Sequence, residues 1–510
     1  MSRLSFTLVV CFLLLVPVSI LAQTATTGTV LGTLKDPNGA VISGARIELT
    51  DNATGAVQSS VANDAGQYVF TTVLPGTYTL KITATGFKQS IVSQVRVEVA
   101  KATTMDVALQ TGELSSTVDV IAAQELQTAD STLGEVVNTQ MLQELPTVTR
   151  RVVELAFLQV ASMPNTGNAN TSRSVAGGRG DQNTFILDGL DISDSQVGGT
   201  CCGNIGSGVP LPVDAIGEFR ASVTNQNASF GRAAGGQYAL TSRRGSEAYH
   251  GSLYWYHRND NLNANSWTRN RLGQKNPELK DNRYGISLGG PLFGPVVPKL
   301  KDKVFFFTNL ERRRFPSQVD TTRIVPTDSL RQGILRFPDA SGNVISYNLR
   351  TSALCGPAGG QACDPRGIGI SPIISQHFGL IPAGNNTTFG DGFNTVGLSG
   401  PVDSTLSSDN VLARVDYNIT DNWRASALWV WAQQNQLTNS FIDIRQGPQQ
   451  LKSLFRQPNA PRHYNFGLTG TLSPSLVNEA RIGYNKSTIT FENPDPSTLV
   501  NGAGMALDLA

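Results

Sequence analysis

Residues 409–432 read DNVLARVDYNITDNWRASALWVWA, and this stretch decides the fold class of the C-terminal half of the chain. In its first half, Val411, Ala413 and Val415 alternate with the charged Arg414 and Asp416. After a short break the alternation resumes, and apolar residues again occupy every second position: Trp423, Ala425, Ala427, Trp429 and Trp431. A period of two predicts β-strands, and a face of tryptophan and aliphatic residues is typical of strands with lipid on one side.

Seven segments of residues 249–510 alternate in this way. Their connectors differ in length: Thr420–Asn422 and Ser473–Ser475 are tight turns, whereas Gln433–Arg462 and Phe315–Ser408 are long. Short turns at one end and long loops at the other indicate an antiparallel outer-membrane β-barrel, although a soluble β-sandwich also alternates. Aromatic residues near the strand ends suit the girdles at the membrane interfaces: Tyr249, Tyr254, Trp255, Tyr256 and Tyr484.

The N-terminus indicates export. Arg3 precedes the apolar stretch Leu4–Leu21, and cleavage after Ala22 would complete a secretory signal peptide over residues 1–22. A membrane-anchoring helix is the alternative. The net charge of +1 and the charged fraction of 15% argue against a nucleic-acid partner, which would require a basic surplus.

Residues 28–110 contain short β-rich runs separated by turns with glycine, proline and asparagine, which predicts a small β-sandwich. Strands are expected at Val30–Leu34, Arg46–Thr50, Gln67–Phe70 and Tyr78–Thr83. The pattern resembles the carboxypeptidase regulatory-like domain, a transthyretin-like and carbohydrate-binding-like fold, at these positions: Gly39, Ala45, Asp64, Gly66, Tyr68, Leu74, Pro75, Gly76, Tyr78, Gly86 and Phe87.

No enzymatic, metal or cofactor site is expected. In the enzymes that carry such a sandwich, the zinc peptidase is a separate domain, and the sequence contains no counterpart of it. The histidines are scattered, and none forms a metal-binding pair: His250, His257, His377 and His463.

Residues 115–245 contain GGRGDQNTFILDG at 177–189, in which Thr184–Leu187 predicts a strand and the following Asp-Gly a tight turn. The order of motifs resembles the α/β plug domain of TonB-dependent outer-membrane receptors. A regulatory-like sandwich before the plug and barrel strands after it resemble the Oar-like branch of these receptors over nearly the whole chain. The motif residues are Gly178, Arg179, Gly180, Leu187, Asp188, Gly189, Ile216, Glu218, Phe219, Phe230, Gly231, Arg232, Gly235, Gly236 and Thr241–Gly245.

The resemblance implies a receptor that binds a scarce solute outside the cell and imports it when TonB and its inner-membrane energising complex move the plug. Ligand specificity is expected in the segments Ser195–Gly208 and Phe315–Ser408, and the solute class stays open between siderophore, glycan and peptide. A TonB box must be extended and detachable so that it adds a strand to the partner's sheet. The candidate box, for which an ordinary linker strand is the alternative, is Thr117, Val118, Asp119, Val120 and Ile121.

Two other classes of function remain open from the residues. Arg179–Asp181 spells the adhesion tripeptide, and the sandwich resembles carbohydrate-binding modules, so a surface adhesion protein and a glycan-binding module are the rivals. A phosphate-binding loop is a poor fit because neither GxGxxG nor a Walker lysine follows. Asp188, Asp191 and Asp194 fall three apart, unlike the alternating ligands of a calcium loop.

The cysteines agree with an oxidising compartment. Cys355 and Cys363 lie in one long loop and are expected to form a disulfide. For the adjacent Cys201 and Cys202, a vicinal bridge, pairing elsewhere and free thiols are all open. Barrels of this family have about 22 strands, so about seven strands over residues 249–510 predict only the N-terminal part of a barrel.

Overall fold

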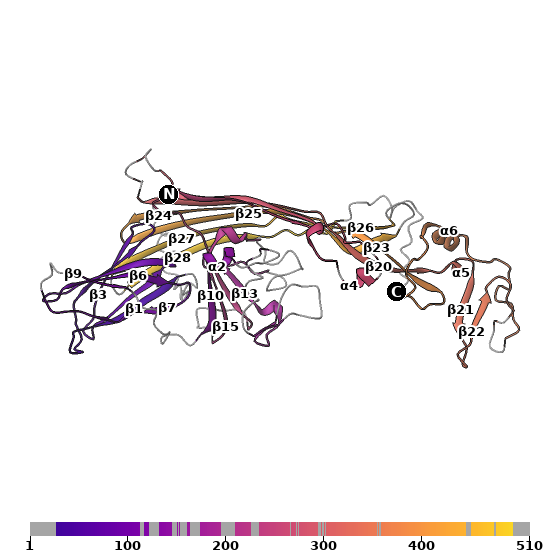
Figure 1. Cartoon of the computed structure of the whole chain (residues 1–510), viewed down its shortest axis with the longest axis horizontal. Helices are drawn as coiled ribbons and strands as arrows, with labels where there is room; N and C mark the ends of the chain where they lie inside the picture. Colours follow the sequence, from indigo (N-terminus) through magenta and orange to yellow (C-terminus); the bar gives the residue numbers. More distant parts are fainter. Residues whose placement is uncertain are drawn as a thin grey trace, which may run out of the picture.

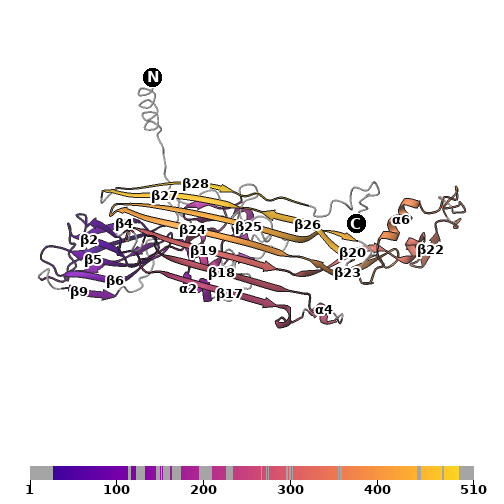
Figure 2. The ribbon, with the colours of Figure 1, turned by 90° about the horizontal axis from the view of Figure 1, so that it is seen from above.

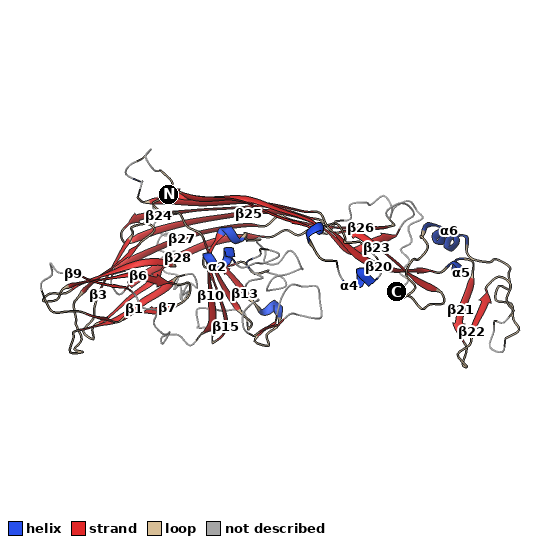
Figure 3. Ribbon diagram, viewed as in Figure 1, coloured by secondary structure: helices blue, strands red, loops and turns tan. Residues whose placement is uncertain are grey.

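The computed structural model consists mainly of β-strands, with a few short helices (Figure 3), so the prediction of a mainly β protein is confirmed. No helix among the described residues is both long and apolar enough to cross a membrane. The structure describes residues 27–112, 117–121, 132–144, 150, 152, 161–163, 174–194, 210–225, 234–265, 267–271, 273, 275–293, 297, 300, 302–353, 355, 359–444, 450–473 and 476–492.

Several predicted features lie outside these residues. They are the signal peptide at 1–22, the Phe230–Gly231 part of the plug motif, the vicinal pair Cys201–Cys202 and the proposed specificity segment Ser195–Gly208.

The N-terminal sandwich consists of two sheets with strand orders β4-β1-β7, in which β8 also pairs with β1, and β3-β2-β5-β6-β9. The four strands expected from the sequence are present within β1, β2, β4 and β5. The strands are β1 Gly28–Lys35, β2 Arg46–Asp51, β3 Val57–Val61, β4 Gln67–Val73, β5 Gly76–Thr83, β6 Gln89–Val97, β7 Ala102–Thr104, β8 Val107–Ala108 and β9 Thr117–Ile121.

Alternation along each strand fills the space between the two sheets. Val30 and Leu34 on β1 are fully buried, as are Leu80 and Ile82 on β5. Gly32 lies where β1 approaches the chain around Met105, and a Cβ there would be 1.9 Å from the Met105 carbonyl oxygen. One hydrophobic core therefore holds the sandwich together. The close approach of β1 to the backbone at Met105 requires glycine at position 32.

Strands within the segment predicted as the plug form a second sheet, with strand order β10-β15-β16-β13-β14, beside a small β11-β12 pair, and we call this unit the plug. Phe185, Phe219 and Tyr238 of this sheet share one hydrophobic cluster with Phe307 and Leu412 of the barrel wall. Plug and barrel therefore have a common core. The elements are β10 Leu133–Asn138, α2 Thr139–Glu144, β11 Ser162–Met163, β12 Ser174–Val175, η1 Gly180–Gln182, β13 Thr184–Leu187, β14 Leu190–Asp191, η3 Val213–Ala215, β15 Ile216–Thr224 and β16 Gln237–Ser242.

The largest sheet is antiparallel, with strand order β17-β18-β19-β24-β25-β27-β28 and β26 paired to β25. Figure 2 shows these strands side by side, and Figure 1 shows plug and sandwich beneath the same face of the sheet. The elements are β17 His250–Asn259, η4 Asp260–Leu262, α4 Trp267–Arg271, β18 Lys280–Pro291, β19 Val304–Phe315, β24 Leu406–Thr420, β25 Trp423–Ile444, β26 Leu451–Asn459, β27 Arg462–Ser473 and β28 Leu476–Lys486.

The two faces of this sheet differ as the sequence predicts. Large apolar side chains such as Leu253 and Ile482 are exposed on the outer face, at 85% and 71% of their surface. The inner face buries polar side chains, among them Asn309, Arg414 and Asn465. An apolar exterior and a polar interior are the pattern of strands between lipid and a plugged lumen.

The predicted connector over Gln433–Arg462 is wrong in its bounds. β25 continues to Ile444 and pairs with β26, so most of the expected loop is a long hairpin. Its sequence, QQNQLTNSF from Gln433, has lost the apolar–polar alternation because this end of the strand has no lipid-facing side to fill. The alternation of apolar and polar residues therefore ends before strand β25 does.

The segment expected as the Phe315–Ser408 loop carries structure of its own. Its two arms, β20 and β23, pair over their full length, and Val325, Leu398 and Val402 pack with Leu451 of β26 in a small core. Cys355 and Cys363 form a disulfide at its far end. The elements are β20 Gln318–Pro326, α5 Asp328–Arg331, β21 Ile334–Pro338, β22 Val344–Asn348, α6 Pro372–Leu380 and β23 Thr395–Asp403.

Strand β4 offers a matched test of the sandwich core. Val73 is fully buried, whereas Val69 on the same strand is 44% exposed. Val73→Ala should lower the free energy of unfolding of the sandwich by about 2 kcal/mol, and Val69→Ala by less than about 0.5 kcal/mol. Hydrogen exchange of the β1 and β5 amides in the full chain measures both changes. Equal effects of the two substitutions would contradict the assigned register.

Candidate functional site

The hairpin between β13 and β14 is one of the parts of the plug that contact the barrel wall. Its turn consists of Asp188 and Gly189, with φ of 44° and 86°. Two successive positive φ values define a type I′ turn, for which Asp-Gly is a preferred sequence. A Cβ at Gly189 would lie 2.9 Å from the Arg481 side chain, so glycine also permits the close approach to the wall.

The Asp188 carboxylate is held from two directions. The Ser242 amide of β16 donates to Oδ1 at 3.1 Å, and the Ser242 hydroxyl donates to Oδ2. Arg414 of β24 places Nη1 3.1 Å from Oδ1 and also donates to the Ser242 hydroxyl at 2.9 Å. Asp188 is 6% exposed, so this charge depends on the partners that replace water.

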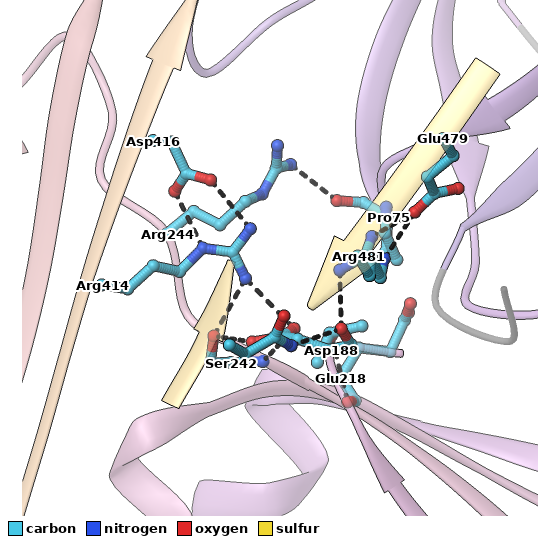
Figure 4. Close-up of polar contacts among 11 residues, drawn as sticks. Pro75, Asp188, Glu218, Ser242, Arg244, Arg414, Asp416, Glu479 and Arg481 are labelled. Atoms are coloured by element: carbon cyan, nitrogen blue, oxygen red, sulfur yellow. Dashed lines mark hydrogen bonds and ion pairs between the residues drawn. The ribbon is translucent and has the colours of Figure 1, made fainter. Parts of the chain in front are cut away.

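The backbone carbonyl of Asp188 binds two further strands of the wall. Asn465 Nδ2 of β27 donates to it at 2.7 Å, and Arg481 Nη1 of β28 donates at 2.6 Å. We call Asp188, Ser242, Arg414, Asn465 and Arg481 the plug anchor (Figure 4). The anchor joins one turn of the plug to three strands of the barrel, β24, β27 and β28.

The two arginines of the anchor have their own counter-charges. Arg414 forms a bidentate pair with Asp416, with both distances 2.8 Å, and Arg481 lies 2.5 Å from Glu479. Next to them, Leu190 fits over Gly483, where a Cβ would be 1.8 Å from its Cδ1. The paired charges and the contact of Leu190 with Gly483 together fix the position of the hairpin on the wall.

The sandwich contacts the same region through the residues that follow the plug strand β16. Arg244, two residues beyond Ser242, lies 3.4 Å from Asp51 and donates to the Pro75 carbonyl at 2.8 Å. Burial, and to a smaller extent Asp51, raise the pKa of Tyr78 to about 12 against the opposing effect of Arg244 and Arg424. The Tyr78 hydroxyl is therefore neutral and donates to the Leu74 carbonyl at 2.7 Å.

A second contact joins the sandwich to the plug strand β15. Glu218 accepts a hydrogen bond from the Val99 amide at 2.8 Å and pairs with Arg96 at 3.0 Å. Arg220 donates to the Ala100 carbonyl. Burial raises the pKa of Glu218, because the Val99 amide and the Arg96 guanidinium compensate only in part for lost hydration.

The structure brings some of the predicted motif residues together and places others elsewhere. Leu187, Asp188 and Gly189 form the hairpin, and Gly235–Gly236 pass close to Asn183, where a Cβ on Gly235 would be 2.6 Å from its Oδ1. Gly178 and Gly180 lie in a separate turn. In that turn Arg179 pairs with Asp181, so the two charges of the adhesion tripeptide bind each other.

The predicted TonB box, Thr117–Ile121, is strand β9. It pairs in parallel with β6, from Gln89↔Thr117 to Ser93↔Ile121. In the described sheet it is the last strand, so one of its edges has no neighbour there. The segment is extended as expected, but it is hydrogen-bonded to the sandwich.

Sequence reasoning missed the barrel half of the site. Arg414 and Asp416 were noted only as the polar face of a strand, and Asn465 and Arg481 carried no motif. Their one signal is charge at lumen-facing positions, where each buried ion requires a partner. Among the residues that the structure describes, no group of histidine, cysteine and carboxylate side chains could hold a metal ion.

Two regions of the chain match known protein families. Residues 241–507 match the outer membrane beta barrel domain family, and residues 29–110 match the carboxypeptidase regulatory-like domain. The TonB-dependent transporter Oar of Myxococcus xanthus is 23% identical over 310 residues, which cover 56% of this chain and 27% of that protein. The chain thus matches about a quarter of the length of this curated relative.

Solved structures with similar folds include the outer-membrane transporter YddB of Escherichia coli, with 12% identity and a TM-score of 0.40 over 69% of this chain and 38% of that one. A mutant of the ferric enterobactin receptor PfeA of Pseudomonas aeruginosa gives 11% identity and a TM-score of 0.40 over 69% and 40%.

Arg414→Gln should release the plug hairpin. Removing one partner of a buried ion pair costs about 3–5 kcal/mol, so amide exchange in β13 and β14 should accelerate roughly 100-fold or more. Arg312→Gln is the matched control, because Arg312 is 55% exposed and pairs with Asp409 at 2.9 Å on the same sheet. The control should change exchange little, since exposed pairs contribute about 0–1 kcal/mol. Unchanged exchange in the Arg414 variant would contradict the anchor.

Glu218 predicts a pH dependence whose sign follows from its raised pKa. A carboxyl with a raised pKa favours the folded state below its unfolded pKa of about 4.3, and this contribution is lost as the pH rises through the folded pKa. The melting temperature of Glu218→Gln should therefore rise relative to wild type between about pH 4 and pH 7. A melting temperature that falls relative to wild type over this range would show that the folded pKa is lowered.

Proposed function

The chain belongs to the outer membrane beta barrel domain family and lies in the outer membrane, and on this premise we propose that it is a TonB-dependent transporter. In this proposal the protein binds a solute at the outer surface and admits it to the periplasm when the plug moves. The transport activity of the Oar relative motivates the proposal, and the plug anchor is the observation that carries it.

We assign the domains accordingly: a signal peptide at 1–22, the sandwich at 28–110, the plug at 115–245 and barrel strands at 249–510. Within this assignment, the polar groups of the Asp188 turn join the plug to the wall, in addition to the apolar cluster that Phe219 and Tyr238 share with Phe307. Desolvation offsets much of the attraction in a buried ion pair, so such a contact positions two parts without fusing them. The Asp188 turn suits a plug that must hold its place at rest and leave it under force.

Strand β9 supplies a route for that force. Its backbone donors and acceptors face β6 on one edge, and the other edge has no neighbour within the described sheet. An energising partner that adds a strand gains main-chain hydrogen bonds there without needing a particular side chain. A pull on Thr117–Ile121 reaches the plug through the chain that connects β9 to β10.

The paired arms β20 and β23, with their small core, extend from the outer end of the sheet (Figure 1), and we assign solute recognition to this region. The proposal requires no covalent chemistry. The ion pair between Arg179 and Asp181 makes an adhesive tripeptide the weaker alternative.

Association with TonB tests the proposal directly. Val118→Pro with Val120→Pro removes two backbone donors of β9, and the matched control, Val118→Ala with Val120→Ala, retains them. The proline variant should lose co-purification of the TonB C-terminal domain with the full chain, whereas the alanine variant should keep it.

Co-purification that survives the prolines would place the energising contact elsewhere. Absence of co-purification even with the wild-type chain would overturn the proposal.

A further inference from the structure

The sandwich lies across one end of the barrel sheet. Figure 1 shows it at the end where β24 and β25 meet, beneath the same face as the plug. The connection between these strands is the two-residue turn Asp421–Asn422, and short turns mark the periplasmic end of an outer-membrane sheet. The sandwich therefore occupies the periplasmic mouth on this side of the lumen.

Contacts with lumen-facing groups hold it there. Arg424 of β25 donates to the Thr72 carbonyl at 3.4 Å, and the Glu247 amide, after the plug strand β16, donates to the Ala53 carbonyl at 3.0 Å. The sandwich thus contacts both the wall and the chain segment that joins plug to barrel.

A small cavity lies where the three parts meet. The cavity at their junction has a volume of about 40 Å³ and is lined by Thr72 of the sandwich, Arg244 of the plug–barrel connection, and Ser426 and Thr469 of the wall. A volume of this size holds a few water molecules. A solute leaving the lumen along this wall would have to displace the sandwich.

We propose that the N-terminal sandwich is a second, periplasmic gate, which must undock from the barrel mouth, in addition to the movement of the plug, before solute passes. This inference rests on the proposed transport function and adds to it. The sandwich is a folded unit with its own core, so it moves as a body. Its contacts with plug and wall are hydrogen bonds and ion pairs, which water replaces on release, together with one small apolar cluster of Val99 with Ala239.

The gate shares its attachment with the plug. Ser242 binds Asp188 of the anchor, and Arg244 two residues later binds Asp51 and the Pro75 carbonyl of the sandwich. A displacement of β16 therefore disturbs both contacts. Plug movement and undocking are coupled through this connection and through Glu218 of β15, which binds Val99 and Arg96 of the sandwich.

Cysteine accessibility tests the gate in the full chain. Ser426→Cys reports on the junction, Asn422→Cys in the adjoining exposed turn is the matched control, and Ala215→Cys, buried among plug and barrel side chains, reports on the plug. Each is placed in a Cys201→Ser, Cys202→Ser background. The probe is a membrane-impermeant fluorescein maleimide, applied to osmotically permeabilised cells with and without a protonophore.

With the protonophore, Ser426→Cys should react at least about 10-fold more slowly than Asn422→Cys. Without it, labelling of Ser426→Cys and Ala215→Cys should both increase. Adding Asp51→Ala and Glu218→Ala should expose Ser426→Cys even with the protonophore.

The alternatives separate the gate from the transporter. Fast labelling of Ser426→Cys in every condition, or labelling that energy raises at Ala215→Cys alone, overturns the gate and leaves the transport proposal standing. If energy changes neither reporter, the proposed function fails together with the gate.

Discussion

The carboxylate of Asp188 facing the guanidinium of Arg414 is the interaction on which the arrangement of plug and barrel depends. Both groups are almost fully buried, so each needs partners that replace water. Ser242, Asn465 and Arg481 complete the polar environment, and Asp416 and Glu479 balance the arginines. One type I′ turn thereby fixes the position of the plug sheet against three strands of the wall.

This interaction follows from a constraint on the sheet itself. Strands with lipid on one face must put their polar side chains on the other, and a polar inner face needs partners when it is covered. The plug supplies them through backbone carbonyls and a few charged groups. The sandwich does the same at one mouth, where Thr72 and Pro75 offer carbonyls to Arg424 and Arg244.

Much of the fold could be predicted from local patterns. Period-two alternation predicted the strands around Val411 and Trp429, and the sequence Asp188–Gly189 predicted the hairpin turn. The resemblance to Oar-like TonB-dependent receptors is confirmed by the family matches and by the curated relative. These features are local or follow the order of the chain, so a single sequence contains them.

The contacts of the site could not be predicted, because they join residues far apart in sequence. Asp188 and Arg481 are 293 positions apart, and Arg244 and Asp51 are 193 apart. No motif records such pairings. The extension of β25 to Ile444 was missed for another reason, since a strand beyond the lipid needs no apolar period.

The most direct test of the account is disulfide trapping between plug and wall, with Leu190→Cys and Gly483→Cys in one Cys201→Ser, Cys202→Ser chain. The two positions touch in the resting structure. The account predicts a high yield of the disulfide in cells without proton-motive force. In energised cells the yield should be lower, because the plug hairpin moves away from the barrel wall. An equal yield in both conditions would show that the plug stays on the wall and would contradict transport by plug movement.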